Sequence, residues 1–156
     1  MVRAAVYTFV FFFVAPGTTA GLVPWLITGW EDPAGLVGWA LVAVGLVVVI
    51  ACFTRFVREG AGTPAPTEPT QRLVVGGIYR YVRNPMYLAV ASMIGGQALL
   101  FRSWGVVVWL GVFMLAVFAF VRGYEEPTLA AQYGAEYDAY RAGVPGWWPR
   151  LTPWRE

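Results

Sequence analysis

A long apolar stretch without a charged residue, residues 34–54, constrains the fold of this chain more than any other feature. It is as long as the roughly 20 residues that a helix needs to cross the hydrocarbon core of a membrane. The whole chain agrees, because 58% of its residues are hydrophobic and 13% are charged, against about 25% charged residues in a typical soluble domain. The sequence therefore predicts an all-α integral membrane protein.

An earlier stretch, residues 4–30, is also uncharged but is interrupted by Pro16, Gly17 and Pro24. Proline removes a backbone donor and clashes with the preceding helical turn, so we expect a bent transmembrane helix here. The basic start of the chain and the small residues 18–21 also resemble a signal peptide with its cleavage site. The apolar character continues beyond those small residues, which favours an uncleaved span.

Two apolar stretches in the second half, residues 85–101 and 103–121, are separated only by Arg102. This spacing predicts a helical hairpin with a tight turn, and it brings the expected number of transmembrane helices to about four. A set of small residues at helical spacing predicts that the first helix of the hairpin packs closely on a neighbour: Ala91, Ser92, Gly95 and Gly96.

Most of the arginines lie on one side of the predicted membrane, whereas Arg102 is alone on the other. By the positive-inside rule, both termini and the middle loop face the cytoplasm, with the protein in the cytoplasmic (inner) membrane. We divide the chain into N-terminal transmembrane helices (1–57), a cytoplasmic linker rich in Pro, Thr and Gly (58–75) and a core that holds the hairpin (76–156).

Composition excludes several classes of site. The chain has no histidine, no lysine and a single cysteine, Cys52. One chain therefore cannot form a disulfide, a Cys-rich zinc site or a Cys–His catalytic pair, and we expect no metal. The net charge of +2 is small, and the arginines flank membrane segments instead of forming a patch, which argues against nucleic-acid binding.

A polar segment directly precedes residues 85–101. Asn84 is a favoured N-cap and Pro85 is a favoured first helical residue, so the pair predicts a helix start. Such a start leaves backbone N–H groups free, and Arg83 lies beside them. The segment therefore suits an anion, for example a carboxylate or a phosphate.

An acidic pair, Glu125 and Glu126, follows the last predicted span. Two adjacent carboxylates repel each other, so they favour a cationic partner. Arg80, Arg83 and Arg122 are the candidates for that partner.

A second interpretation of the acidic pair is structural, because Pro127 is a natural first residue for a new helix whose N-terminus the carboxylates would stabilise. Four residues beyond it recur at helical spacing and predict an amphipathic helix that lies against the membrane or caps the bundle: Leu129, Tyr133, Tyr137 and Tyr140. Both interpretations stay open, but sites of opposite sign at the same end of a hairpin fit a zwitterionic ligand with an excess positive charge.

Together these motifs resemble the isoprenylcysteine carboxyl methyltransferase and phospholipid methyltransferase family of integral membrane enzymes. The segments "GGIYRYVRNPMYLA" and "EEPTLAAQYGAEYDAYRAGVPGWWPRLTPW" carry the resemblance, which covers the chain from Gly76 onward. Asn84 stands where the family often has histidine, and Ala89 where it often has glycine. Asparagine does not change its charge near neutral pH, so a mechanism that uses that histidine as a base is excluded.

The resemblance implies about four transmembrane helices, with a C-terminal cytoplasmic helix over a pocket for S-adenosylmethionine. It implies a set of cofactor-binding residues: Gly77, Tyr79, Arg83, Asn84, Pro85, Tyr87, Glu125, Glu126, Tyr137 and Tyr140. Arg83, Glu125 and Tyr87 are the candidate catalytic residues. Arg83 and the helix start would meet the carboxylate of the cofactor, and the glutamates would meet a positive or hydroxylated part.

The predicted function is methyl transfer from S-adenosylmethionine to a lipophilic acceptor: a prenylcysteine-like carboxylate, a lipid headgroup or a small hydrophobic nucleophile. Without histidine and lysine, an acceptor that is already nucleophilic suits the chain best. One alternative is a nicotinamide-dependent membrane reductase of the sterol reductase type, although its anionic cofactor would need more basic residues. The other is a non-catalytic scaffold whose arginines bind anionic lipid headgroups.

Overall fold

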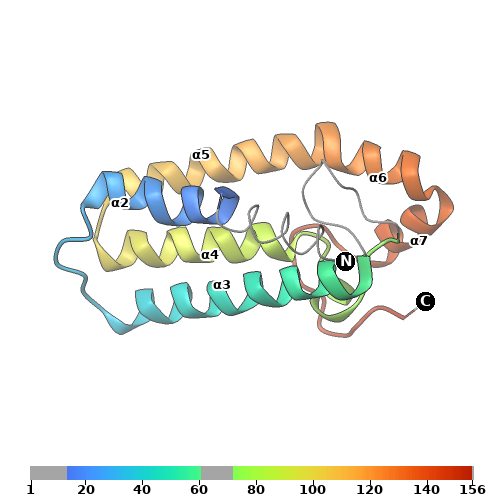
Figure 1. Cartoon of the computed structure of the whole chain (residues 1–156), viewed down its shortest axis with the longest axis horizontal. Helices are drawn as coiled ribbons and strands as arrows, with labels where there is room; N and C mark the ends of the chain where they lie inside the picture. The colour runs from blue at the N-terminus through green and yellow to red at the C-terminus, as the bar shows by residue number, and fades with distance from the viewer. Residues whose placement is uncertain (1–13, 61–71, 156) are drawn as a thin grey trace.

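The computed structural model of the chain describes residues 14–60 and 72–155, and no strand occurs among them. In chain order the elements are η1 (Thr18–Leu22), α2 (Val23–Thr28), α3 (Leu36–Arg55), η2 (Phe56–Gly60), η3 (Gly77–Arg80), α4 (Pro85–Leu100), α5 (Trp104–Phe120), η4 (Val121–Glu125), α6 (Glu126–Tyr133) and α7 (Ala135–Gly143), where η marks a π- or 3₁₀-helical turn. Figure 1 shows α2 to α5 side by side in an elongated bundle, with α6 and α7 at one end. The predicted all-α fold is confirmed for the described residues.

Two helices among the described residues are long and apolar enough to cross a membrane, Leu36–Arg55 and Trp104–Tyr133. The second runs without a break through α5, η4 and α6. Only 28% and 22% of their apolar windows are buried, so most of these side chains point away from the bundle, as helices facing lipid require. The helix α4 is apolar as well but shorter. The predicted apolar stretches 34–54, 85–101 and 103–121 thus correspond to α3, α4 and α5, within two residues at each end.

The helix before the first loop is irregular just ahead of Pro24, where we expected a bend. The π-turn η1 directs the Val23 N–H to the Thr18 oxygen, and Pro24 has no N–H to donate. The oxygens of Thr19 and Ala20 therefore lack helical partners. Trp109 Nε1 donates to Thr19 O (2.8 Å) and Gln97 Nε2 donates to Ala20 O (2.6 Å), so side chains of α4 and α5 satisfy both. Residues 4–13 of this predicted span lie outside the described residues.

The close packing predicted for α4 is made against α3. A Cβ built on Gly96 would lie 2.7 Å from the Gly38 oxygen, and one on Gly45 would lie 2.6 Å from the Ala89 oxygen. Real Cβ atoms do not approach backbone so closely, so the two helices touch backbone to backbone. Ser92 Oγ adds a hydrogen bond to Leu41 O at 3.1 Å.

The interpretation of Pro127 as the start of a separate helix is wrong. Glu125 has helical φ and ψ of −68° and −52°, so the helix passes through this residue and offers no free N-terminus for the acidic pair. The real break comes at Gly134, which has a φ of +52°. The aromatic face predicted for one amphipathic helix is therefore divided between α6 and α7, although Tyr133 and Tyr137 still belong to one apolar cluster.

The C-terminal segment after α7 returns to the start of α4. Arg83 N donates to Pro145 O (2.9 Å) and Asn84 N donates to Gly146 O (3.2 Å). Further along, Trp154 N donates to Arg80 O (2.9 Å). The loop before α4 is thus held from both sides, by the bundle and by the chain terminus. The predicted linker, residues 58–75, falls largely outside the described residues.

Candidate functional site

Arg83 is the centre of a polar cluster at the end of the bundle where α4 begins and α6 and α7 lie (Figure 1). Its Nη1 donates to Glu126 Oε1 at 2.8 Å and to the Tyr137 hydroxyl at 3.1 Å. Its Nε donates to Val144 O at 2.9 Å. The side chains of Arg83 and Glu126 are 14% and 12% exposed, so water screens this ion pair weakly.

The predicted cationic partner of the acidic pair is therefore Arg83, and it serves Glu126. Arg141 approaches the other oxygen of Glu126 at 3.4 Å. Arg80 instead donates its Nε to Trp154 O. Among the described residues Arg122 forms no ion pair within 4.0 Å, which leaves it outside the cluster.

Glu125 is held differently from its neighbour. The hydroxyl of Tyr87, one turn into α4, donates to Glu125 Oε2 at 2.9 Å. No arginine in the described part of the chain lies within ion-pair distance of Glu125. The two adjacent carboxyl groups thus differ in their partners, because Glu126 pairs with arginine and Glu125 is bonded to a phenol.

Asn84 occupies the predicted N-cap position, with Pro85 as the first helical residue. Its side chain nevertheless makes no capping hydrogen bond, which departs from the role expected of it. Its Nδ2 is buried and has no hydrogen-bond partner in the described part of the chain. A buried donor left unpaired costs about 1–3 kcal/mol, so this amide is an unsatisfied group at the edge of the cluster.

Gly146 faces that amide from the C-terminal segment. A Cβ built on Gly146 would lie 3.2 Å from Arg83 Nη2 and 3.5 Å from Asn84 Nδ2. The absence of a side chain therefore leaves a small space between two donors. Sequence reasoning missed this position, and the only local signal was a glycine beside Pro145 in the terminal segment.

Two of the predicted site tyrosines, Tyr79 and Tyr140, make contacts that hold elements of the fold together. The Tyr140 hydroxyl donates to Tyr79 O at 2.8 Å, and the Tyr79 ring packs edge-on against Phe56 with centroids 5.7 Å apart. Burial raises the pKa of both phenols above its ordinary value, so they are neutral at physiological pH. Burial likewise raises the pKa of Tyr137, while the Arg83 charge opposes that shift.

Gly77 lies apart from the cluster. It has a φ of +58°, and a Cβ there would come 2.7 Å from Arg55 Nε. Gly77 therefore contacts the end of α3, and its glycine identity is explained by backbone conformation and this contact. Of the predicted site residues, one group is brought together around a single charge network: Arg83, Asn84, Pro85, Tyr87, Glu125, Glu126 and Tyr137.

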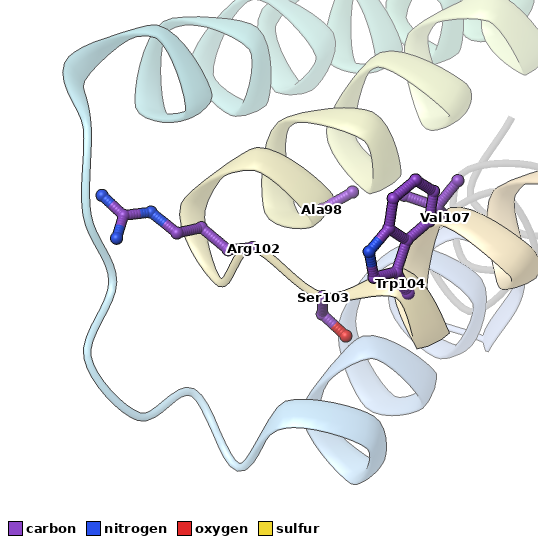
Figure 2. A pocket seen from close by; sticks show the side chains of 5 residues that line it. All are labelled: Ala98, Arg102, Ser103, Trp104 and Val107. Carbon is purple, nitrogen blue, oxygen red and sulfur yellow. The ribbon is translucent and has the colours of Figure 1, made fainter.

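An open pocket of about 250 Å³ lies at the other end of the bundle, at the α4–α5 turn. Its lining residues are Ala98, Arg102, Ser103, Trp104 and Val107. Figure 2 shows that the Arg102 side chain points away from Trp104 and Val107. This pocket is remote from the polar cluster and contains none of the predicted site residues.

A sequence model of the phospholipid methyltransferase family matches residues 34–136, from the start of the α3 stretch to the beginning of α7. The chain belongs to the phospholipid methyltransferase family. The match contains Arg83, Tyr87, Glu125 and Glu126, and it starts earlier than the resemblance found from Gly76 onward. It ends before the C-terminal segment.

The phospholipid methyltransferase family is a family of methyltransferases. The two long apolar helices agree with a location in the membrane. None of the curated proteins compared with the chain matches it. The family match includes every predicted site residue of the polar cluster except Tyr137.

Proposed function

We propose that this phospholipid methyltransferase family protein is a multi-pass enzyme of the cytoplasmic membrane that transfers a methyl group from S-adenosylmethionine to a lipophilic acceptor. The observation that carries the proposal is the arrangement of Asn84 and Glu125: in one cluster lie a buried donor and an acidic side chain, the first without a hydrogen-bond partner and the second without an ion-pair partner among the described residues. Two complementary groups on one ligand would satisfy both.

The anionic end of that ligand is assigned to Asn84 and Arg83. Asn84 Nδ2 lacks a partner, and Arg83 Nη2 lies next to the space above Gly146. The start of α4 adds free backbone N–H groups and the positive end of a helix dipole. These donors fit the amino-acid carboxylate of S-adenosylmethionine.

The cationic end is assigned to Glu125. This carboxylate has no arginine partner among the described residues, so it favours a positive group nearby. S-adenosylmethionine, when bound, supplies a methyl group on a positively charged sulfur together with an ammonium group. Glu126 is already neutralised by Arg83 and serves to fix the position of that arginine.

The residues of the chain would contribute alignment, exclusion of water and one proton acceptor. The bond from Tyr87 to Glu125 joins α4 to η4 and holds the carboxylate in place. If the acceptor is an amine, Glu125 Oε2 accepts the proton that the amine must lose before it attacks. If the acceptor is a carboxylate, no proton moves and the site works by positioning alone.

The membrane arrangement that goes with this function has four spans, with the polar cluster at the cytoplasmic side. α3, α4 and α5 supply three spans, and the helix that ends in α2 supplies the first. The acceptor would enter laterally from the lipid, because the cluster lies where the apolar helices end. Amino-headgroup lipids, prenylcysteine-like carboxylates and small hydrophobic nucleophiles all fit this route.

The test is calorimetric titration of the detergent-purified protein with S-adenosylmethionine, using Glu125→Gln and the matched control Glu136→Gln. Glu136 lies exposed on α7, so the control makes the same chemical change outside the cluster. Loss of a charged hydrogen-bonding partner costs about 1.5–3 kcal/mol, so Glu125→Gln should weaken binding about 10- to 100-fold and the control should not.

Three outcomes would contradict parts of the proposal. A folded wild-type protein that binds no S-adenosylmethionine would refute the function itself. Equal binding by the two glutamine variants would refute the role given to Glu125. Saturable binding of a reduced nicotinamide dinucleotide in a parallel titration would favour the reductase alternative.

A further inference from the structure

The C-terminal segment, residues 145–155, presents two large apolar side chains outward from an ordered backbone. Trp148 is 81% exposed and Leu151 is 99% exposed. Between them, Arg150 turns its guanidinium inward, where Nη1 donates to Gly143 O. A loop that faces water would favour the reverse arrangement, with the charge outward and the apolar groups inward.

The position of this segment along the bundle explains the inversion. Trp147 packs against Phe118, in the last turn of α5, with ring centroids 5.9 Å apart. Arg150 N donates to Tyr81 O at 2.9 Å, just before α4 begins. The segment thus runs from the end of one apolar helix to the start of another, which is the level where the hydrocarbon core must end.

The surface beside the segment is also apolar. Phe118 of α5 packs against Trp147 and is still 51% exposed, so the apolar surface of α5 continues onto the C-terminal segment. Tryptophan favours the boundary between headgroups and acyl chains, because its ring is apolar and its N–H is polar. Arg155, at the end of the segment, is exposed and suits anionic headgroups.

We propose that residues 145–155 form an interfacial anchor in which Trp148 and Leu151 insert into the lipid leaflet on the side of the membrane that holds the polar cluster. The occupant of this surface is the lipid, not a second copy of the chain. Because the same segment holds the backbone of Arg83 and Asn84 through Pro145 and Gly146, the anchor fixes the depth of the loop before α4 relative to the headgroups.

Site-directed spin labelling of the full chain in vesicles of phosphatidylcholine and phosphatidylglycerol tests this. Trp148→Cys and Leu151→Cys each receive a nitroxide, while the native Cys52 is fully buried and should stay unlabelled, as the wild-type protein will show. Leu115→Cys on the outer face of α5 is the lipid control, because this side chain is 74% exposed. Glu136→Cys on the exposed face of α7 is the aqueous control.

Dissolved oxygen concentrates in lipid and a nickel chelate stays in water, so their effects on the label report its environment. Labels at positions 148 and 151 should be relaxed more by oxygen than by the nickel chelate, as the label at position 115 should be. The label at position 136 should show the opposite order. A label at either position that behaves like the one at 136 would overturn the proposal. Labels shielded from both reagents would overturn it too, because that result places a second protein chain over the segment. None of these outcomes depends on methyl transfer.

Discussion

Replacement of Arg83 by methionine tests how the polar cluster is held together. Methionine keeps a long unbranched side chain and removes the guanidinium. The substitution deletes the ion pair with Glu126 and the hydrogen bonds to Tyr137 and Val144. These bonds join the start of α4 to α6, α7 and the C-terminal segment, so the loss acts on the docking of the whole C-terminal part.

The magnitude follows from burial. Removing one partner of a buried ion pair costs about 3–5 kcal/mol, and both partners here are at most 14% exposed. Glu126 keeps Arg141 at 3.4 Å, which favours the lower end, while two acceptors in buried residues lose about 1 kcal/mol each. We expect a loss of about 5 kcal/mol, and at roughly 2–4 °C per kcal/mol the melting temperature should fall by about 10–20 °C.

Cys52 makes the measurement direct. It is the only cysteine of the chain and is fully buried, so a dye that fluoresces on reaction with thiols reports unfolding as the detergent-purified protein is heated. Arg122→Met is the matched control, because Arg122 is exposed and forms no ion pair within 4.0 Å among the described residues. If Arg83→Met melts together with Arg122→Met, the cluster does not stabilise the fold and the reasoning is refuted.

The same assay checks three further expectations. Trp109→Phe should cost about 1–3 kcal/mol, because it leaves the Thr19 oxygen without its side-chain donor; an unchanged melting temperature would contradict this. Gly45→Val should destabilise by about 1–3 kcal/mol or more, because its Cβ would lie 2.6 Å from a backbone oxygen of α4, whereas Gly111→Val, with nothing within 4 Å of its Cβ, should not. Burial raises the pKa of Tyr140 above 10.0, so as the pH rises the unfolded chain loses this proton before the folded protein does. The contribution of Tyr140 to the free energy of unfolding is therefore complete below pH 10.0 and should fall as the pH rises beyond it. Tyr140→Phe should melt with a shallower alkaline slope, and an identical slope would argue against this tyrosine as a source of the fall.

The helices of the bundle were predictable because their signals are local. An uncharged run bounded by arginine gives α3, and Asn84 with Pro85 gives the first residue of α4. The hairpin follows from Arg102, which takes a φ of +47° in the turn. Each of these features depends only on residues next to one another in the chain.

The side-chain partners within the site were not predictable, because they depend on the contact between the C-terminal segment and the loop before α4. Three arginines were candidates for the acidic pair, and all three lie on the same predicted side of the membrane. Arg83 is the partner because Pro145 accepts from its backbone N–H and Val144 accepts from its side chain. Arg80 is removed from competition by Trp154, which is far along the sequence.

Pro127 was misjudged for a physical reason that also applies at Pro24, where a bent helix was expected. A π-turn precedes Pro24 and another precedes Pro127, each ending two residues before the proline. The wider π-turn pairs each N–H with the oxygen five residues back, so the helix accommodates a residue that has no donor. Pro127 was therefore interpreted as a helix start, whereas the helix continues through it.

The π-turn before Pro127 also sets the directions of the Glu125 and Glu126 side chains. The turn η4 contains Glu125 and directs the Glu126 N–H to the Val121 oxygen, five residues back. One extra residue in a helix rotates everything after it by about 100°, and π-turns often occur at functional sites for that reason. The rotation falls where α5 leaves its apolar stretch, and there Glu125 meets Tyr87 while Glu126 meets Arg83. The proline that resembled a helix start thus marks the turn that aims the two carboxylates at two different partners on the α4 side.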